Sequence, residues 1–501
     1  MTASVTSATA LGFNGHIIDI ECDAKKGLPA IAIVGLGNKS IDEAKERIRS
    51  AITNSHFEFP ASKITINLAP ADLPKDGSHF DVPMALAILI VTGQVKQSSV
   101  EGIAFAGELS LTGELRPVRG IINITETARN HKIHTIIVPK QNAEQAALVN
   151  DISVVGARTL ADIYLHLIGE KLLHVTRQPK PEEAPEYTTD LGDIHGQDQA
   201  KRALVIAAAG GHNILFDGPP GAGKTMLARA LVSILPSPTY EEQLAITKLH
   251  SLVGEVTEGI VSVLPFRSPH HTASQISLIG GGTKPLPGEV SLAHCGVLFL
   301  DEMPEYARAS LEALRQPLED REVHVARAAG RMTYPAKFML VATRNPCPCG
   351  YYGDPDHSCS CSLNQILAYE KRVSGPLLDR IDMIVPVGRV HERDLLKHSA
   401  SAESPGIRTK VNEARERQYA RNNRITNAEL PSKNIGEVTN LSEEATELLN
   451  TATSRLKLSA RSYFKAIKVA RTIADLAGSD FILAPHMAEA LHYRQKPNHT
   501  E

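Results

Sequence analysis

Tryptophan is absent from the 501-residue chain, and aromatic residues make up only 4% of it. Aromatic side chains provide the platforms on which single-stranded nucleic acids stack, so such platforms are not prominent here. The chain also lacks a strong excess of one charge, because its formal net charge is −3. This balance argues against a protein that coats polyanions over its whole surface, and any nucleic-acid surface must be a local patch.

Long apolar segments are missing as well. A membrane-spanning helix needs roughly 18 apolar residues, and the longest candidate, residues 82–91, is too short. Residues 1–11 contain no basic segment of the kind that opens a signal peptide. We therefore expect a cytoplasmic protein with no membrane contact. At roughly 150 residues per domain, its length predicts about three domains.

Residues 177–190 have the composition of an interdomain linker, with three prolines and six charged residues. Residues 1–176 alternate strand and helix signals, which predicts an α/β or α+β domain. Residues 191–390 form a second α/β unit, and residues 391–501 show predominantly helical patterns. The predicted order is therefore two domains with sheets followed by a helical domain.

A glycine-rich loop at 218–225 fits G-x-x-x-x-G-K-[ST], the phosphate-binding loop (P-loop) of nucleoside triphosphatases. It follows an apolar run at 214–216 and precedes a helical pattern at 225–235, which is the strand–loop–helix order that the motif requires. Glycines let backbone N–H groups close around phosphate oxygens, and the helix N-terminus adds its positive dipole. The lysine would reach the β/γ-phosphates and the threonine hydroxyl would face Mg²⁺. The residues expected to bind ATP are Gly218, Pro219, Pro220, Gly221, Ala222, Gly223, Lys224 and Thr225.

A second motif is the apolar strand 297–300, which ends in Asp301 and Glu302. Beside a P-loop, Asp301 can hold Mg²⁺, and Glu302 is placed to orient or deprotonate the attacking water. An acid pair after a strand is weak evidence alone, but it is strong in a domain that also carries a P-loop. Lys224 and Asp301 are 77 residues apart. A minimal strand–helix–strand unit needs only roughly 30 residues, so we predict an insertion between them.

Four of the six cysteines lie within fifteen residues, namely Cys347, Cys349, Cys359 and Cys361. In a reducing compartment such clustering points to a metal rather than to disulfides. Four thiolates suit tetrahedral Zn²⁺, although one residue between the members of each pair is a tighter spacing than usual. An iron–sulfur cluster and four free thiols stay open as alternatives, and His357 is a further candidate ligand.

Several longer stretches resemble the magnesium-chelatase-like AAA+ ATPases of the ComM/YifB family, and the resemblance covers nearly the whole chain. Residues 193–197 are similar to the AAA+ segment that contacts the nucleotide base. The stretches most specific to the family are 266–274, 280–282, 287–294 and 345–350. The resemblance implies a P-loop AAA+ α/β domain at 191–390 and a helical lid at 391–501.

The family resemblance also implies roles for residues outside the P-loop. Asn345 matches the sensor-1 position, which orients the attacking water together with Glu302. Arg380, in a segment that resembles the arginine-finger segment, is the expected finger, and Arg372 is the alternative. Arg461 matches the sensor-2 arginine, which reads the γ-phosphate from the lid. A finger supplied by a neighbouring subunit implies a ring homo-oligomer, and family members of the ComM type act as hexameric DNA helicases in branch migration during natural transformation.

Residues 1–176 resemble the C-terminal domain of Lon-type proteases. Residues 75–81 lie where those proteases place their nucleophilic serine, but His79 occupies the serine position. Ile122 occupies the position of the partner lysine, and an isoleucine cannot act as the base of a Ser–Lys dyad. The domain is therefore expected to be non-proteolytic and to serve assembly or contact with a partner.

Residues 322–327 and 331–334 alternate on both sides of a turn that contains glycine, which predicts a β-hairpin. Hairpins at this location line the channel of related rings, so Arg327 and Arg331 could contact DNA phosphates. An exposed hairpin with solvated arginines is an equally good interpretation. Residues 408–424 hold six basic and two acidic residues on a predicted helix, a pattern that more often marks a solvated face than a DNA contact.

These patterns together predict a ring-forming AAA+ ATPase that uses ATP and Mg²⁺ to move on DNA, as in helicase or branch-migration work. Single-stranded or branched DNA is then the expected partner. Two alternatives stay open. One is a motor subunit of the magnesium-chelatase kind that acts on a large partner protein, and the other is an ATP-driven protein remodeller, which the Lon-like domain slightly favours.

Overall fold

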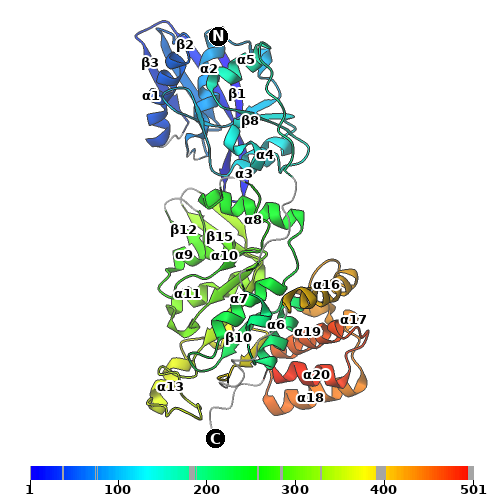
Figure 1. Cartoon of the computed structure of the whole chain (residues 1–501). Helices are drawn as coiled ribbons and strands as arrows, with labels where there is room; N and C mark the ends of the chain where they lie inside the picture. The colour runs from blue at the N-terminus through cyan, green and yellow to red at the C-terminus, as the bar shows by residue number, and fades with distance from the viewer. Residues whose placement is uncertain are drawn as a thin grey trace.

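The computed structural model describes residues 2–35, 39–73, 75, 77–179, 187, 189–256, 259–282, 286–327, 330–390 and 402–494. An amino-terminal unit, a central α/β unit and a carboxyl-terminal helical unit follow one another along the chain (Figure 1). Among the described residues, no helix combines the length and the apolar composition that crossing a membrane requires.

The amino-terminal unit is built on a seven-stranded sheet with the order β3-β4-β2-β1-β5-β8-β9. β1 and β2 form a long antiparallel hairpin, whereas β1–β5, β5–β8 and β8–β9 are parallel pairs. This mixed sheet agrees with the α+β pattern of the sequence. The strands are β1 (Thr2–Leu11), β2 (Asn14–Lys25), β3 (Ala30–Val34), β4 (Lys63–Ala69), β5 (Ile103–Phe105), β8 (Thr135–Pro139) and β9 (Ser153–Ala157), and a short separate pair consists of β6 (Glu108–Leu109) and β7 (Leu115–Arg116).

The apolar run at 82–91 forms a core helix of this unit. In α2 (Asp81–Val91) every residue from Asp81 to Ile90 is buried, as expected for a helix that is apolar on all sides. The buried carboxylate of Asp81 is paired with Arg47 at 2.8 Å, which offsets the cost of removing its charge from water. The other helices of this unit are α1 (Lys39–Asn54), α3 (Ile121–Asn130), α4 (Ala143–Ala146) and α5 (Leu160–Leu167).

The central unit contains a parallel five-stranded sheet with the order β11-β14-β17-β10-β18. Its inner strands are apolar and buried, as in a sheet that helices cover on both faces. The carboxyl ends of β10, β14 and β17 therefore meet at one edge of the sheet. The strands are β10 (Ile214–Asp217), β11 (Phe266–Arg267), β14 (Val297–Leu300), β17 (Met339–Arg344) and β18 (Met383–Pro386).

Helices and short strands connect the strands of this sheet. The insertion predicted between the P-loop and Asp301 is present as α8, α9, α10, β11 and the small antiparallel pair β12–β13. The helices of the unit are α6 (Asp198–Gly210), α7 (Lys224–Ile234), α8 (Tyr240–Val253), α9 (Gln275–Ile279), α10 (Glu289–Leu292), α11 (Arg308–Ala313), α12 (Arg315–Asp320), α13 (Leu363–Glu370) and α14 (Gly375–Leu378), and the pair consists of β12 (Gly280–Gly281) and β13 (Leu286–Pro287).

The predicted hairpin is also present, as β15 (Glu322–Arg327) paired antiparallel with β16 (Gly330–Pro335). Ala328 and Ala329, at its turn, lie outside the described residues, and so do the side chains of Arg327 and Arg331. Their contact with DNA therefore stays a prediction.

The helical unit packs against α6 and α7 in one shared hydrophobic core. It consists of α16 (Ser404–Arg421), α17 (Ile435–Val438), α18 (Glu443–Leu456), α19 (Ala460–Leu476) and α20 (Ala484–His492). Basic residues of α16 contact this core: Arg408 donates to the carbonyl of Ser233 and Arg415 donates to that of Ala208 at 2.7 Å. These contacts give arginines of the basic stretch 408–424 a structural role.

The amino-terminal unit rests on α8 of the central unit (Figure 1). The Lys248 ammonium pairs with Glu126 and lies 3.9 Å from the ring centre of Phe13. Nearby, Gly120 donates its N–H to Ser251 Oγ at 3.2 Å. These contacts join α3 and the β1–β2 turn to the central unit.

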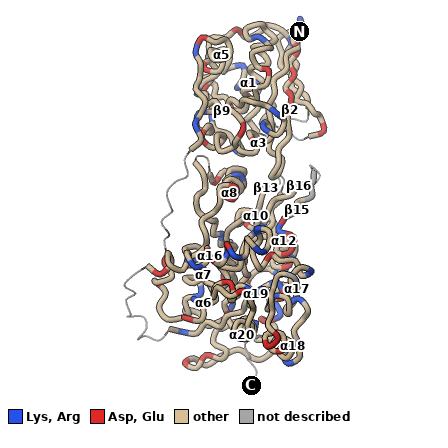
Figure 2. Tube along the Cα trace, turned by 90° about the vertical axis from the view of Figure 1, so that its right-hand side faces the viewer, with Lys and Arg blue, Asp and Glu red and all other residues tan. Residues whose placement is uncertain are grey.

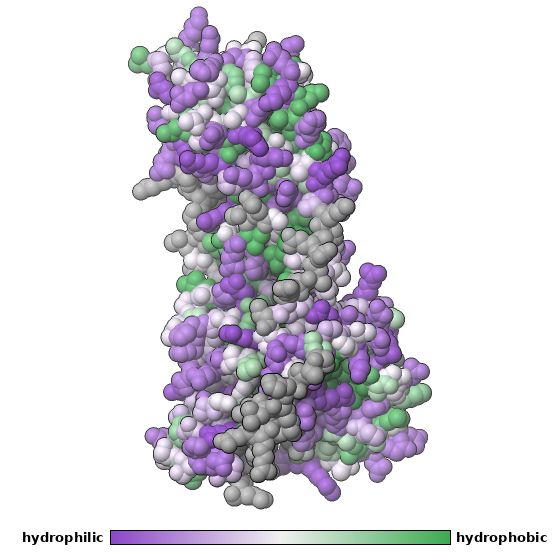
Figure 3. Space-filling view, in the orientation of Figure 1, coloured by the Kyte–Doolittle hydropathy of each residue, from purple (hydrophilic) through white to green (hydrophobic). Residues whose placement is uncertain are grey.

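Figure 2 shows acidic and basic residues interspersed along the trace, without a long segment of one charge. On the face drawn in Figure 3, hydrophilic side chains predominate and apolar ones occur in small groups. Both views agree with the balanced composition of the chain.

Candidate nucleotide-binding site

The P-loop connects β10 to α7 at the carboxyl edge of the parallel sheet. Gly221 and Gly223 have φ of 78° and 81°, a conformation that side chains other than glycine rarely adopt. Gly218 is required for a different reason, because a Cβ there would lie 2.0 Å from the carbonyl oxygen of Val387. The backbone of the loop thus depends on its glycines both for its shape and for its packing beside the end of β18.

The side chain of Lys224 is buried and its ammonium is held by three acceptors. It donates to the carbonyls of Gly218 and Pro219 at 2.6 and 2.8 Å, and to Asn345 Oδ1 at 3.0 Å. Burial lowers the pKa of Lys224, and the nearby carboxylates of Asp217 and Asp301 oppose that shift. The structure thus brings together the P-loop lysine and the polar residue at the sensor-1 position.

Asp301, at the end of β14, lies beside the start of α7. Thr225 Oγ1 donates to Asp301 Oδ2 at 3.3 Å. A hydroxyl and a carboxylate are the kinds of protein oxygen that would hold Mg²⁺ beside the phosphates in a P-loop enzyme. Thr225 and Asp301 therefore fit the expected Mg²⁺ site.

Thr343, on β17, joins the two acids after β14, and the sequence motifs did not identify it. Its fully buried hydroxyl donates to Asp301 Oδ1 at 2.7 Å and accepts from the Glu302 N–H at 2.8 Å. Glu302 has a left-handed backbone with φ of 50°, which is uncommon for a residue that is not glycine. One side chain thus fixes both the carboxylate of Asp301 and the backbone of Glu302, whose own side chain is exposed.

The ends of β17 and β10 are tied by an ion pair. Arg344 donates to Asp217 Oδ2 through Nη2 at 2.6 Å and through Nε at 3.0 Å. Because Asp217 precedes the P-loop and Arg344 precedes Asn345, this pair fixes the spacing between the loop and the sensor-1 position.

Arg380 and Arg461 lie together, away from their own P-loop. The carbonyl of Arg380 accepts from the side chain of Asn213 at 3.1 Å, and Asn213 precedes β10, whereas the P-loop follows that strand. The side chain of Arg380 donates to the carbonyls of Arg315 and Pro376 and pairs with Glu319 at 2.6 Å. Arg461 pairs with the same glutamate. The two arginines therefore occupy the amino-terminal edge of the sheet.

Arg372, the alternative finger, is half-exposed and pairs with Glu305 at 3.0 Å. It also donates to the carbonyl of Pro304 at 3.4 Å. It belongs to a different group of side chains from Arg380 and Arg461.

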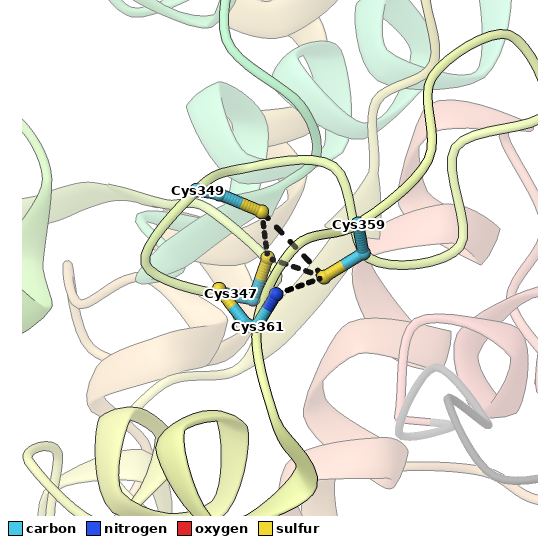
Figure 4. A group of neighbouring side chains, drawn as sticks. All are labelled: Cys347, Cys349, Cys359 and Cys361. Carbon is cyan, nitrogen blue, oxygen red and sulfur yellow. Dashed lines mark hydrogen bonds between the residues drawn. The ribbon is translucent and has the colours of Figure 1, made fainter.

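The four clustered cysteines converge on one point directly after Asn345 (Figure 4). Their sulfur atoms all lie within 4.8 Å of one another, and the distances of Cys347 to Cys349 and to Cys359 are 3.3 and 3.6 Å. Tetrahedral zinc with Zn–S bonds of about 2.3 Å separates its sulfurs by about 3.8 Å, whereas a disulfide joins them at about 2.05 Å. The arrangement therefore fits a metal and does not fit disulfides.

The loop that carries the cysteines packs against the P-loop. Gly350 has φ of 87°, and a Cβ there would lie 2.6 Å from Pro220 Cδ. His357 is turned to other partners, since its Nδ1 lies 2.9 Å from Arg389 Nη1 and its ring stacks on Tyr351. It is therefore not part of the cluster of sulfur atoms.

Comparison with known proteins identifies the family. The profile described as "Magnesium chelatase, subunit ChlI" matches residues 190–395, a further ChlI profile matches 20–142, and the profile of the ChlI C-terminal region matches 401–494. Competence protein ComM of Haemophilus influenzae is 44% identical over 98% of this chain and 97% of its own length. The chain belongs to the magnesium-chelatase-like family of ComM and YifB. Another member, the uncharacterized protein YifB of Escherichia coli, is 43% identical over 98% of this chain and 96% of its own length.

Membership in the ComM/YifB family suggests an ATPase motor of the AAA+ type. This agrees with the convergence of the P-loop, Asp301 and Asn345 at one edge of the parallel sheet. The mixed α/β architecture is likewise the one expected from the sequence.

This member of the ComM/YifB family also shows a more distant similarity to Lon proteases. Lon protease of Leptospira interrogans is 30% identical over 159 residues, which are 30% of this chain and 19% of that protein. At the expected positions of the dyad, His79 is buried and Ile122 is fully buried in an apolar cluster. Ser78, one residue before His79, donates its hydroxyl to Glu108, and the side chain at 122 has no group that can accept a proton.

Proposed function

We propose that this chain is an ATPase that works in a ring and couples ATP hydrolysis to the remodelling of DNA. The convergence of Lys224, Thr225, Asp301 and Asn345 supports the ATPase activity. Phosphoryl transfer depends mainly on positioning and on charge stabilisation. Lys224 would neutralise the β/γ-phosphates, while Asn345 and Glu302 would orient the attacking water. Thr225 and Asp301 would hold Mg²⁺, which supplies charge neutralisation at the phosphate oxygens when bound.

The positions of Arg380 and Arg461 support the ring. The length of β10, about 13 Å for four residues, separates their edge of the sheet from their own P-loop. We therefore propose that both arginines act on the nucleotide of a neighbouring subunit. Such fingers contribute about 10³–10⁵ in rate in other nucleotide hydrolases. A homo-oligomeric ring, most simply a hexamer, places every P-loop next to such a pair.

DNA is proposed as the substrate because of the hairpin β15–β16 and because one relative is named a competence protein. A hairpin that carries Arg327 and Arg331 near its turn can contact phosphates in a central channel. Contacts to the phosphate backbone do not depend on sequence, which suits a helicase or branch-migration motor on single-stranded or branched DNA. The name of the competence protein suggests that such a motor would act in natural transformation.

The experiment that tests this function measures ATPase rate and DNA affinity across a salt series. Forked DNA should stimulate the ATPase, and affinity should fall steeply with salt because each phosphate contact releases counterions. The double variant Arg327→Ala/Arg331→Ala should weaken binding to every sequence alike and flatten the salt slope. The matched control Lys96→Ala/Lys433→Ala removes the same charge from exposed positions outside the hairpin and outside the basic stretch 408–424, and it should bind like wild type.

Two results would change the proposal. A double variant with the wild-type salt curve would exclude the hairpin from the DNA path. A wild-type protein that does not bind DNA would exclude the helicase, and would favour a motor subunit of the chelatase kind or an ATP-driven protein remodeller. The weak similarity of this chain to Lon proteases supports the ATP-driven protein remodeller. For that function, a partner protein, rather than DNA, would stimulate hydrolysis.

The remaining parts of the proposal concern the metal and the domains. We propose Zn²⁺ at the four cysteines, because their sulfur atoms match its tetrahedron. We also propose a non-proteolytic Lon-like domain at 1–176, a linker at 177–190, an ATPase core at 191–390 and a lid at 391–501. A cytoplasmic location would keep the thiols reduced for metal binding.

A further inference from the structure

Glu319, near the end of α12, contacts both arginines at the amino-terminal edge of the sheet. Its Oε2 accepts from Arg380 Nη2 at 2.6 Å, and its Oε1 accepts from Arg461 Nη2. Each arginine therefore takes a different oxygen of one carboxylate. Because Arg461 belongs to α19 and Arg380 precedes β18, this carboxylate joins the lid to the core.

The three side chains differ in how firmly they are held. The side chain of Arg380 is only 9% exposed, and it donates to two carbonyls in addition to Glu319. Arg461 is 46% exposed, and among the described residues its ion pair is with Glu319 alone. Arg380 thus anchors the glutamate, and the glutamate in turn orients the more exposed arginine.

Electrostatics also explain why the two arginines share one glutamate. Two guanidinium groups that share one carboxylate lie close together and repel each other. The negative charge of Glu319 offsets this repulsion and keeps the two arginines side by side. Removing it leaves two unshielded cations on neighbouring elements, and the more exposed Arg461 is free to move away.

We propose that Glu319 is a positioning residue for ATP hydrolysis, which holds Arg380 and Arg461 as one pair of cations that the subunit presents to its neighbour's nucleotide. This inference rests on the proposed function, in which both arginines act across a subunit interface. Donors that are already in place when charge develops in the transition state need no reorganisation. A fixed pair therefore contributes more to the rate than two independent arginines.

The test uses the full-length protein with Glu319→Gln, which keeps the shape of the side chain and removes its charge. We expect kcat for ATP to fall about 10- to 100-fold, a loss like that caused in metal enzymes by removing a group that orients a metal ligand. The KM for ATP should stay near the wild-type value, because the P-loop of the same subunit is untouched. Glu319→Asp, whose shorter carboxylate spans both arginines less well, should show an intermediate loss.

A mixture of variants shows whether Glu319 acts on the nucleotide of its own subunit or on that of the neighbouring subunit. Lys224→Ala disables the P-loop but leaves Glu319 and both arginines intact. Mixed rings of Glu319→Gln and Lys224→Ala should therefore recover activity, because some interfaces pair an intact P-loop with an intact arginine pair. The matched control is Glu489→Gln, which removes another bridge between core and lid, from Arg202 at 2.8 Å, and should hydrolyse ATP near the wild-type rate.

Three outcomes overturn the inference: a wild-type kcat for Glu319→Gln, an equal loss for Glu489→Gln, or a loss that Lys224→Ala does not rescue although it rescues Arg380→Ala. Failure of the proposed function looks different. In that case Arg380→Ala and Arg461→Ala would themselves show no rescue by Lys224→Ala in assembled rings. Melting temperatures and ring assembly, measured for every variant, distinguish a variant that no longer folds or assembles from one in which only the two arginines are misplaced.

Discussion

The hydroxyl of Thr343 offers a sharp test of the proposed catalytic centre. The substitution Thr343→Val keeps a branched side chain of similar shape on β17 but deletes the hydroxyl. Two interactions are lost together, namely the bond to Asp301 Oδ1 at 2.7 Å and the bond from the Glu302 N–H at 2.8 Å. The substitution therefore loosens the proposed Mg²⁺ ligand and the proposed water-orienting residue without touching the P-loop.

The size of the effect follows from the kind of bond that is lost. A hydrogen bond to a charged group contributes about 1.5–3 kcal/mol, and each 1.36 kcal/mol in the barrier changes the rate tenfold. If Thr343 holds Asp301 in the transition state, kcat should fall about 10- to 100-fold. ATP affinity should change much less, because Lys224 and its partners remain. The unpaired N–H of Glu302 should also lower the free energy of unfolding by about 1–3 kcal/mol.

Steady-state ATPase assays and binding of a non-hydrolysable ATP analogue measure the two parts separately. Thr343→Ser is the matched control, since it keeps the hydroxyl and should retain most of the activity. The reasoning is refuted if the valine variant hydrolyses ATP at the wild-type rate. An equal loss of kcat in the serine variant would show that the methyl group, and not the hydroxyl, matters.

Three further outcomes are expected. Glu302→Gln should bind ATP normally and hydrolyse it at least about 100-fold more slowly, since a general base contributes about 10²–10⁴ in rate. Turnover at the wild-type rate would show that another residue orients the water. Purified protein should contain one zinc per chain by elemental analysis. Cys347→Ser should release the zinc and lower the melting temperature, since structural zinc contributes on the order of 10 kcal/mol to the folding of small modules. Wild-type protein that is free of metal when prepared without chelator would contradict the zinc site. Burial raises the pKa of Asp382, but Lys465 and His212 outweigh burial and hold that pKa below its usual range. The ionised Asp382 should therefore stabilise the fold above about pH 4, and this stabilisation should be lost as the pH falls further. In denaturant titrations at neutral pH, Asp382→Asn should lower the free energy of unfolding by about 3–5 kcal/mol, and it should weaken the dependence of stability on acid pH. Equal stability of variant and wild type would show that the ion pair contributes nothing to stability.

Local sequence was sufficient for the parts of the site that lie within one strand and its following loop. The P-loop could be predicted because its glycines and the flanking strand and helix are contiguous, and β10, the loop and α7 follow in that order. The hairpin β15–β16 has strong alternation around its turn, and its backbone pairing was predicted for that reason. The two cysteine pairs needed only a short loop to bring them together.

Features that depend on packing between distant segments could not be predicted in the same way. Thr343 resembles any threonine in a buried strand, and only the order of strands places its hydroxyl against Asp301 and Glu302. The position of Arg461 depends on where the helical unit packs, and nothing near residue 461 indicates that Glu319 would be its partner. Contacts of this kind arise from the shared core of the helical unit and the central unit, which is formed by residues more than 200 positions apart.

The turn between β1 and β2 has a mechanical consequence for the hairpin β15–β16. Gly12 has φ of 68°, and a Cβ at this position would lie 3.1 Å from the Cβ of Met332 on β16. Phe13 and Met332 both pack against the same apolar cluster of the central unit, and Figure 2 shows the hairpin below the amino-terminal unit. A displacement of β16 toward the amino-terminal unit would therefore press on this turn. The amino-terminal unit would then move together with the hairpin, so a probe placed on that unit could detect a movement of β15–β16.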